Sequence, residues 1–166
     1  MLLASGMALA ATLEGNDRPN TLVGTAGPDD IRGRGGDDIL KGEGGIDRVR
    51  GDGGNDNVSG GPGGTSDRRE RVEGNNGNDT VSGDEGADEV RGDSGNDDML
   101  GGDGPDLMRA DDSGIDTVSA GPGDDVIEAH EDAGTDTIDC GDGIDSVRFD
   151  AGVDVVADNC ERRDPR

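Results

Sequence analysis

Single aliphatic residues recur at an almost constant interval along most of the chain. Eleven of the fourteen intervals between them are nine residues long, and the other three are longer. The neighbours of each aliphatic residue are mostly polar, as in Asn57-Val58-Ser59. This alternation predicts very short strands that each direct one side chain inward. The aliphatic positions are Leu22, Ile31, Leu40, Val49, Val58, Val72, Val81, Val90, Met99, Met108, Val118, Ile127, Ile138, Val147 and Val156.

One aliphatic residue in nine is too little apolar surface for a unit that folds alone, so the units must stack, as in other solenoids. We number each repeat so that the aliphatic residue is eighth, as in the repeat 33–41. Glycine then occupies the first and fourth positions of most repeats, and aspartate occupies the sixth. Because glycine permits positive φ angles and leaves carbonyl groups open to a ligand, we expect a tight glycine-rich turn before each strand.

The composition narrows the possible functions. Gly and Asp make up 64 of the 166 residues, Phe149 is the only aromatic residue, and the net charge is −25. Low hydrophobicity with high charge is typical of disordered chains, but the repeat and the excess of Asp over Glu favour ordered turns. The charge argues against nucleic acid and anionic membranes as partners. It favours a hard cation with oxygen ligands, calcium above all.

The repeat resembles the Gly-Gly-x-Gly-x-Asp-x-U-x nonapeptide of the RTX, or haemolysin-type, calcium-binding family. The resemblance covers residues 20–157, with an insertion at 64–71. It implies an all-β fold, a right-handed parallel β-roll (a β-solenoid) of about 15 repeats with two repeats in each coil. Calcium ions (Ca²⁺) would lie between stacked turns. Because the charge and the sparse apolar content oppose a metal-free core, we expect the chain to fold on binding calcium.

The resemblance also assigns calcium ligands. One ion would be shared by turns one full coil apart, which pairs Asp29 with Asp47, Asp38 with Asp56, Asp79 with Asp97, and Asp88 with Asp106. Backbone carbonyls would complete six or more oxygen ligands. The alternative is that these aspartates only cap turns. The expected ligands are Asp29, Asp38, Asp47, Asp56, Asp79, Asp88, Asp97, Asp106, Asp116 and Asp125, with Gly24, Gly27, Gly33, Gly36, Gly42, Gly45, Gly83 and Gly86.

Two parts of the array depart from the repeat. The insertion at 64–71 is expected to be a surface loop, and the repeat that it enters has Glu70 as the only substitute for its aspartate. After residue 110 other residues replace the first-position glycine, so turns should persist there with less calcium. The replacements are Ala110, Ala120, Ala129, Cys140 and Phe149.

Cys140 and Cys160 are the only cysteines, 20 residues apart. In a coil of 18 residues this spacing places them about one rung apart, within reach of a disulfide. Two free buried thiols are the alternative. A zinc site lacks further ligands at a suitable spacing.

The first residues suggest export. Residues 1–10 are uncharged and end in Ala8-Leu9-Ala10, which is typical of a secretory signal sequence and too short to span a bilayer. Residues 11–19 form an N-terminal segment, and residues 158–166 form a polar C-terminal tail. With a disulfide, this organisation predicts a secreted, extracellular protein.

No motif for nucleophilic, phosphate-binding or zinc-hydrolase chemistry occurs in the sequence. We therefore expect a protein that is not an enzyme, namely a secreted calcium-binding module with a structural or buffering role. The alternative is a fragment or accessory of a larger RTX adhesin, toxin or exoenzyme whose active domain lies elsewhere.

Overall fold

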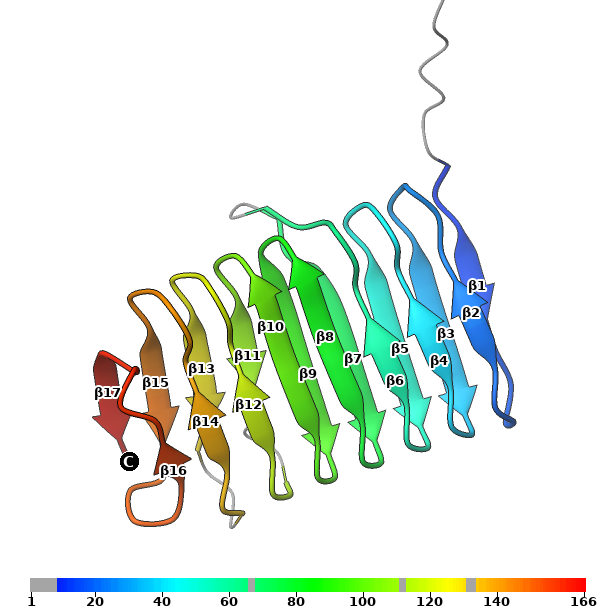
Figure 1. Ribbon diagram of the computed structural model, residues 1–166. Helices are drawn as coiled ribbons and strands as arrows, with labels where there is room; N and C mark the ends of the chain where they lie inside the picture. Colours follow the sequence, from blue (N-terminus) through cyan, green and yellow to red (C-terminus); the bar gives the residue numbers. More distant parts are fainter. Residues whose placement is uncertain (1–8, 66–67, 111–112, 131–133) are drawn as a thin grey trace, which may run out of the picture.

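The computed structural model describes residues 9–65, 68–110, 113–130 and 134–166. Within these ranges the chain winds through about eight coils and contains no helix (Figure 1). Each full coil contributes one strand to each of two parallel sheets. The predicted all-β solenoid with two repeats per coil is confirmed.

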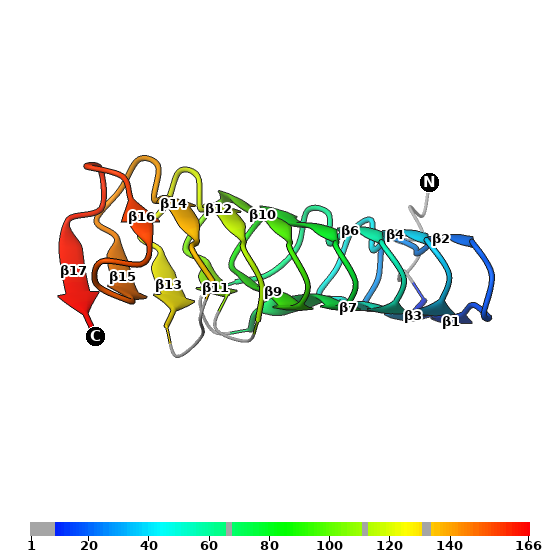
Figure 2. The ribbon, with the colours of Figure 1, turned by 90° about the horizontal axis from the view of Figure 1, so that it is seen from below.

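The odd-numbered and even-numbered strands form separate layers, as Figure 2 shows. The first sheet has the order β1 (Thr12–Glu14), β3 (Asp30–Gly35), β5 (Arg48–Gly53), β7 (Glu70–Asn76), β9 (Asp88–Ser94), β11 (Leu107–Arg109), β13 (Val126–Ala129), β15 (Ser146–Phe149) and β17 (Arg162–Pro165). The second has the order β2 (Thr21–Val23), β4 (Ile39–Lys41), β6 (Asn57–Ser59), β8 (Thr80–Glu85), β10 (Asp98–Asp103), β12 (Thr117–Ser119), β14 (Thr137–Asp139) and β16 (Val155–Val156).

The core is a double column of the aliphatic residues that the nine-residue period identifies. In the first sheet Ile31 pairs with Val49, which pairs with Val72, and the second sheet stacks its aliphatic residues in the same way. The side chains of this column from Ile31 to Val147 are at most 1% exposed. Each such side chain contributes about 1.5–3 kcal/mol of burial free energy, and none of it is available to a repeat without its neighbours.

The first sheet extends one strand beyond each end of the array expected at 20–157. Strand β1 places Leu13 in register with Ile31, and β17 pairs with β15. The insertion leaves the solenoid at Gly64 and returns at Glu70, where β7 begins. Thr65, Arg68 and Arg69 are exposed, as expected of a surface loop.

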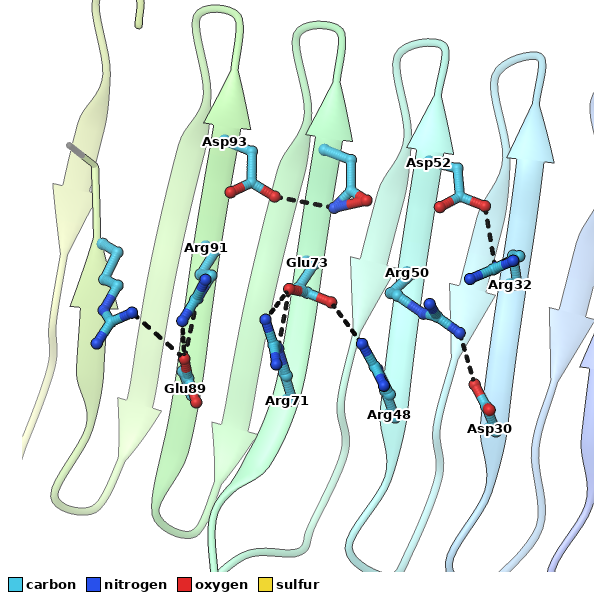
Figure 3. A network of polar contacts seen from close by, with 12 residues as sticks. Asp30, Arg32, Arg48, Arg50, Asp52, Arg71, Glu73, Glu89, Arg91 and Asp93 are labelled. Atoms are coloured by element: carbon cyan, nitrogen blue, oxygen red, sulfur yellow. Dashed lines mark hydrogen bonds and ion pairs between the residues drawn. The ribbon is translucent and has the colours of Figure 1, made fainter. Parts of the chain in front are cut away.

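Arginine side chains gather on the outer face of the first sheet, where they alternate with carboxylates (Figure 3). Arg50 contacts Asp30 at 3.1 Å, and Arg71 contacts Glu73 at 2.6 Å. Ion pairs on a solvated face contribute about 0–1 kcal/mol each, although Glu73 itself is only 6% exposed. Their main effect is to place positive charge close to an acidic array and so reduce its self-repulsion.

No helix among the described residues is long and apolar enough to cross a membrane. The predicted signal sequence at 1–10 lies, except for its last two residues, outside the described residues.

The predicted disulfide is confirmed, because Cys140 and Cys160 are bonded with their Cα atoms 5.3 Å apart. It closes a loop across the last coil, and constraint of a loop of this length contributes about 3 kcal/mol. Since coils of a solenoid couple mainly to their neighbours, we expect reduction to loosen residues 134–166 and leave residues 74–109 protected. Hydrogen exchange in saturating calcium, with and without reductant, measures this. Loss of protection over 74–109 on reduction would contradict a local role.

Candidate metal centres

The sixth-position aspartates face the interior of the solenoid. Since side chains alternate along a strand, the aspartate, the aliphatic residue two positions later and the next first-position residue all point inward. In β9 these are Asp88, Val90 and Gly92. All ten aspartates predicted as ligands are at most 5% exposed, and Asp136 and Asp145 are fully buried. A buried carboxylate is costly unless a donor, a proton or a cation compensates it, so each must have a partner.

One oxygen of each of these carboxyl groups, except that of Asp88, accepts a hydrogen bond from a backbone N–H. The Asp29 N–H donates to Asp47 Oδ1 at 2.7 Å, and the Asp38 N–H donates to Asp56 Oδ1 at 2.8 Å. The same bond joins Asp79 to Asp97 and Asp88 to Asp106. We call the two rows of these bonds the aspartate ladder. The structure thus stacks all four aspartate pairs expected from the sequence, and one oxygen of the second aspartate in each pair accepts a backbone N–H.

The other oxygen of most ladder aspartates is buried and has no hydrogen-bond partner. Turn capping alone therefore does not account for these side chains. A second oxygen with no donor suits a cation, which takes the place of the missing hydrogen. The oxygens concerned are Oδ2 of Asp38, Asp47, Asp56, Asp79, Asp88, Asp97, Asp106, Asp125 and Asp145.

The first-position glycines leave room beside these oxygens. A Cβ on Gly33 would overlap Asp38 Oδ2 and lie 2.7 Å from the Gly51 carbonyl oxygen. A Cβ on Gly83 would lie 2.9 Å from Asp88 Oδ2 and 2.6 Å from Gly101 O. Gly24 and Gly42 have the same surroundings. A carboxylate oxygen and a carbonyl oxygen from the next coil thus border each space. The carboxylate oxygen has no hydrogen bond beside Gly33, Gly42 and Gly83, whereas Asp29 Oδ2 beside Gly24 accepts the Thr25 N–H. Calcium prefers oxygen donors of both kinds.

The expectation that first-position glycines adopt positive φ is wrong, since none of them does. Their role is to provide space. Positive φ occurs at the fourth position, in Gly36, Gly45 and Gly86, and at the second position, where Asp52 has φ 72°. Gly27 and Gly123 are exceptions among the fourth-position glycines, because neither has a positive φ.

Burial changes the electrostatics of the ladder. It raises the pKa of Asp79, Asp88 and Asp106 from 3.8 to about 7. The pKa of Asp56 and of Asp125 rises to about 6, again mainly through burial. Charges of stacked neighbours add to the effect, as those of Asp97 and Asp56 do at Asp79. Without a cation, these five aspartates therefore keep their protons until the pH reaches about 6 to 7.

No three side chains of His, Cys, Asp or Glu in the described ranges converge closely enough to hold a metal ion by themselves. A site here consists of one or two carboxylates completed by backbone carbonyls. In the last coils the space itself is filled, because Ala110, Ala120, Ala129 and Cys140 are at most 2% exposed and belong to the core. Asp116 and Asp125, predicted as ligands, belong to repeats whose first position is Ala110 and Ala120. Their carboxylates therefore lie in the ladder but have no glycine space beside them.

The ladder continues beyond the residues that the repeat identifies. The Asp145 N–H donates to Glu161 Oε2 at 2.9 Å, where a further aspartate would stand. Glu161 lies in the tail outside the nine-residue register, so no signal in the period points to it.

Comparison with known families agrees with this geometry. The family model for the RTX calcium-binding nonapeptide repeat matches the chain in four copies, at residues 14–49, 35–64, 73–108 and 111–147. A search among curated proteins found no match.

The raised pKa values predict a pH dependence. In the unfolded chain these aspartates lose their protons near pH 4, whereas in the fold several keep them until about pH 6 to 7. The metal-free fold is therefore most stable below about pH 4 and loses stability as the pH rises to 7. Calcium binding, which needs the deprotonated form, strengthens over the same range. Thermal unfolding without metal and calcium titration, both between pH 4.5 and 7.5, measure the two trends. If stability and calcium affinity rose together with pH, the buried ladder would be contradicted.

The space beside the ladder can be tested with a matched pair of glycines in β3. Gly33→Ala should destabilise the fold by about 1–3 kcal/mol, because the added methyl group would overlap Asp38 Oδ2 and the Gly51 carbonyl oxygen. The same methyl group should weaken calcium binding, because it occupies the space beside these oxygens. Gly35→Ala should change either quantity little, since its nearest neighbours would lie 3.6 Å away. Denaturant unfolding and calorimetry compare the two variants. Equal effects would show that the space is not required.

Proposed function

Because the chain belongs to the family of RTX calcium-binding nonapeptide repeat proteins, we propose that it is a secreted module whose turns bind several calcium ions. The observation that carries the proposal is the row of buried Oδ2 atoms without hydrogen-bond partners. Each ion would bind a ladder carboxylate, for example that of Asp38, and carbonyl oxygens of the glycine turns one coil apart. The repeats that keep glycine at the first position, the last of which is Gly101, leave space for such an ion.

Folding is coupled to binding in this proposal. The chain carries a net charge of −25, and its interior combines one aliphatic residue per repeat with one carboxyl group. Removing that charge requires protons or cations. Calcium supplies positive charge at each coil without the proton uptake that neutral pH opposes, so binding free energy becomes folding free energy.

The role is structural rather than catalytic. The candidate sites hold carboxylate and carbonyl oxygens that are buried on both sides by stacked coils, which suits a closed structural site. Two observations support secretion. The disulfide between Cys140 and Cys160 is typical of proteins in oxidising compartments. Each candidate site has only one or two carboxylates, which suits binding at the millimolar calcium concentrations found outside cells.

Calcium-coupled folding has a direct test. We expect the chain in chelator at pH 7.5 to lack strand structure and to gain it on addition of millimolar calcium, because repulsion within the acidic interior is then removed. Far-ultraviolet circular dichroism of the full chain measures the change. Magnesium at the same concentration serves as the control for ionic strength. A chain that is equally ordered with chelator and with calcium would overturn coupled folding.

Ligand assignment can be tested with adjacent aspartates of which one faces inward and the other outward. Asp97 is 3% exposed and belongs to the ladder, whereas Asp98 begins β10 and is exposed. We expect Asp97→Asn to bind one or two calcium ions fewer than the unchanged chain. Asp98→Asn removes the same charge and should keep the full number. Native mass spectrometry counts the ions, and equal counts for the two variants would contradict the assignment.

A further inference from the structure

The insertion at 64–71 carries two arginines that the rest of the fold engages little. Arg68 and Arg69 are both exposed, and within the described part of the chain neither forms an ion pair. The Arg69 side chain donates one hydrogen bond, to the backbone carbonyl of Asp88 at 3.3 Å. Most arginines of the first sheet, by contrast, pair with carboxylates, as Arg50 does with Asp30. Arg68 therefore presents to solvent a guanidinium group that no described carboxylate neutralises.

The backbone of Arg68 lies outside both sheets. Among the described residues it hydrogen-bonds to Thr65 alone, whose N–H donates to the Arg68 carbonyl at 2.7 Å. The Arg68 N–H donates in return to the Thr65 carbonyl at 3.0 Å and to Thr65 Oγ1 at 3.2 Å. Strand β7 begins only at Glu70. Opening this small hairpin breaks bonds to one residue and leaves every strand paired, so it requires less free energy than opening a strand.

The basic residues elsewhere in the described ranges are less accessible to a protease. Most lie within strands, as Arg50 does in β5, which pairs with a strand on either side. Arg18 is exposed in a turn, but Pro19 follows it, and proline removes the N–H and fixes φ at the bond that a protease would cut. Arg163 lies in β17, where its Nε donates to the Cys160 carbonyl at 3.1 Å. The insertion is therefore the most accessible site for an arginine-directed protease.

We propose that the bond between Arg68 and Arg69 is a processing site for a serine endoprotease of the trypsin class. Such an enzyme binds the side chain before the cut bond in a pocket that holds a carboxylate, which suits the Arg68 guanidinium. Hydrolysis breaks the C–N bond between the two residues. One water molecule supplies the hydroxyl group of the new Arg68 carboxyl group and a hydrogen of the new Arg69 amino group. Exposed loops are the usual place of such cuts in folded proteins.

The cut chain stays assembled because the coils on either side of the insertion are stacked. Strands β5 and β7 pair at five positions in register, and β6 and β8 pair at three. A ladder bond also crosses the cut, since the Asp56 N–H donates to Asp79 Oδ1 at 2.7 Å. The aliphatic column continues from Val49 to Val72. Two chains, 1–68 and 69–166, therefore form one solenoid after processing.

Calcium then controls whether the two chains remain together, a step that rests on the proposed function. Residues 1–68 contain 11 acidic and 7 basic residues, a net charge of −4, and residues 69–166 contain 29 and 8, a net charge of −21. Both chains are acidic, so they repel each other when no cation compensates the ladder. In the uncut protein the peptide bond keeps the two parts at a high effective concentration. In the cut protein nothing replaces that bond, so removal of calcium releases the two chains.

The first test is limited digestion of the full chain by trypsin at pH 7.5 in saturating calcium, with the fragments identified by mass spectrometry. We expect the first cut to follow Arg68. Arg68→Gln should slow the loss of intact chain by about tenfold or more, because the bond after Arg69 leads directly into β7 and is reached only when that strand opens. Arg68→Lys keeps the positive charge and should be cut at the same place. Arg18→Gln removes the same charge from an exposed turn and should be cut as fast as the unchanged chain.

The second test follows the cut chain by analytical ultracentrifugation after the protease has been inhibited. We expect one particle in calcium and two after addition of chelator. A folded chain that is first cut elsewhere, or that is cut equally fast in Arg68→Gln, would overturn the processing site and leave the proposed function standing. Separation of the chains in calcium, or a single particle in chelator, would overturn the control by calcium. If the unchanged chain is digested throughout in calcium, it has no calcium-dependent fold and both proposals fail.

Discussion

A carboxyl group that leaves water requires a donor, a proton or a cation, and this protein buries about two of them in every coil. The first oxygen of nearly every such aspartate is satisfied by an N–H of the preceding coil, as Asp47 Oδ1 is by Asp29; Asp88 is an exception. That bond is available only when coils stack in register. The second oxygen is left without a partner in most coils. The parallel register, the glycine-lined space and the demand for cations all depend on this division between the two oxygens.

The two ends of the solenoid meet the same requirement by different means. In the regular coils, glycine at the first position leaves space beside the carboxylate. In the last coils, alanine methyl groups and the disulfide occupy that column, and all of them are buried. Apolar contacts and a covalent bond there supply part of the stability that the earlier coils obtain from charge compensation. Along the chain, the interior thus changes from one suited to ions in the regular coils to one suited to side-chain packing in the C-terminal coils.

Much of this arrangement could be predicted from the period of nine. The stacked strands and the column of aliphatic residues can be derived from it. The pairing of Asp38 with Asp56 and the reach of the disulfide follow only once the family resemblance supplies two repeats per coil. The role of Gly33 could not be found in this way, because its Cβ would overlap a side chain five residues ahead and a carbonyl one coil away. The same holds for Glu161, which joins the ladder only through the fold. The gathering of arginine on one sheet has a period of 18, so a search at nine does not reveal it.

The ladder bonds all point the same way, from the N–H of one coil to the carboxylate of the next. At the C-terminal end, Asp154 and Glu161 accept the last of these bonds. Removing a coil from that end would leave N–H donors of the ladder without their acceptors, whereas removing one from the other end would leave carboxylate oxygens without their donors. The solenoid therefore has chemically different ends: a copy of the chain stacked end to end could continue the ladder only in one direction, with the same polarity.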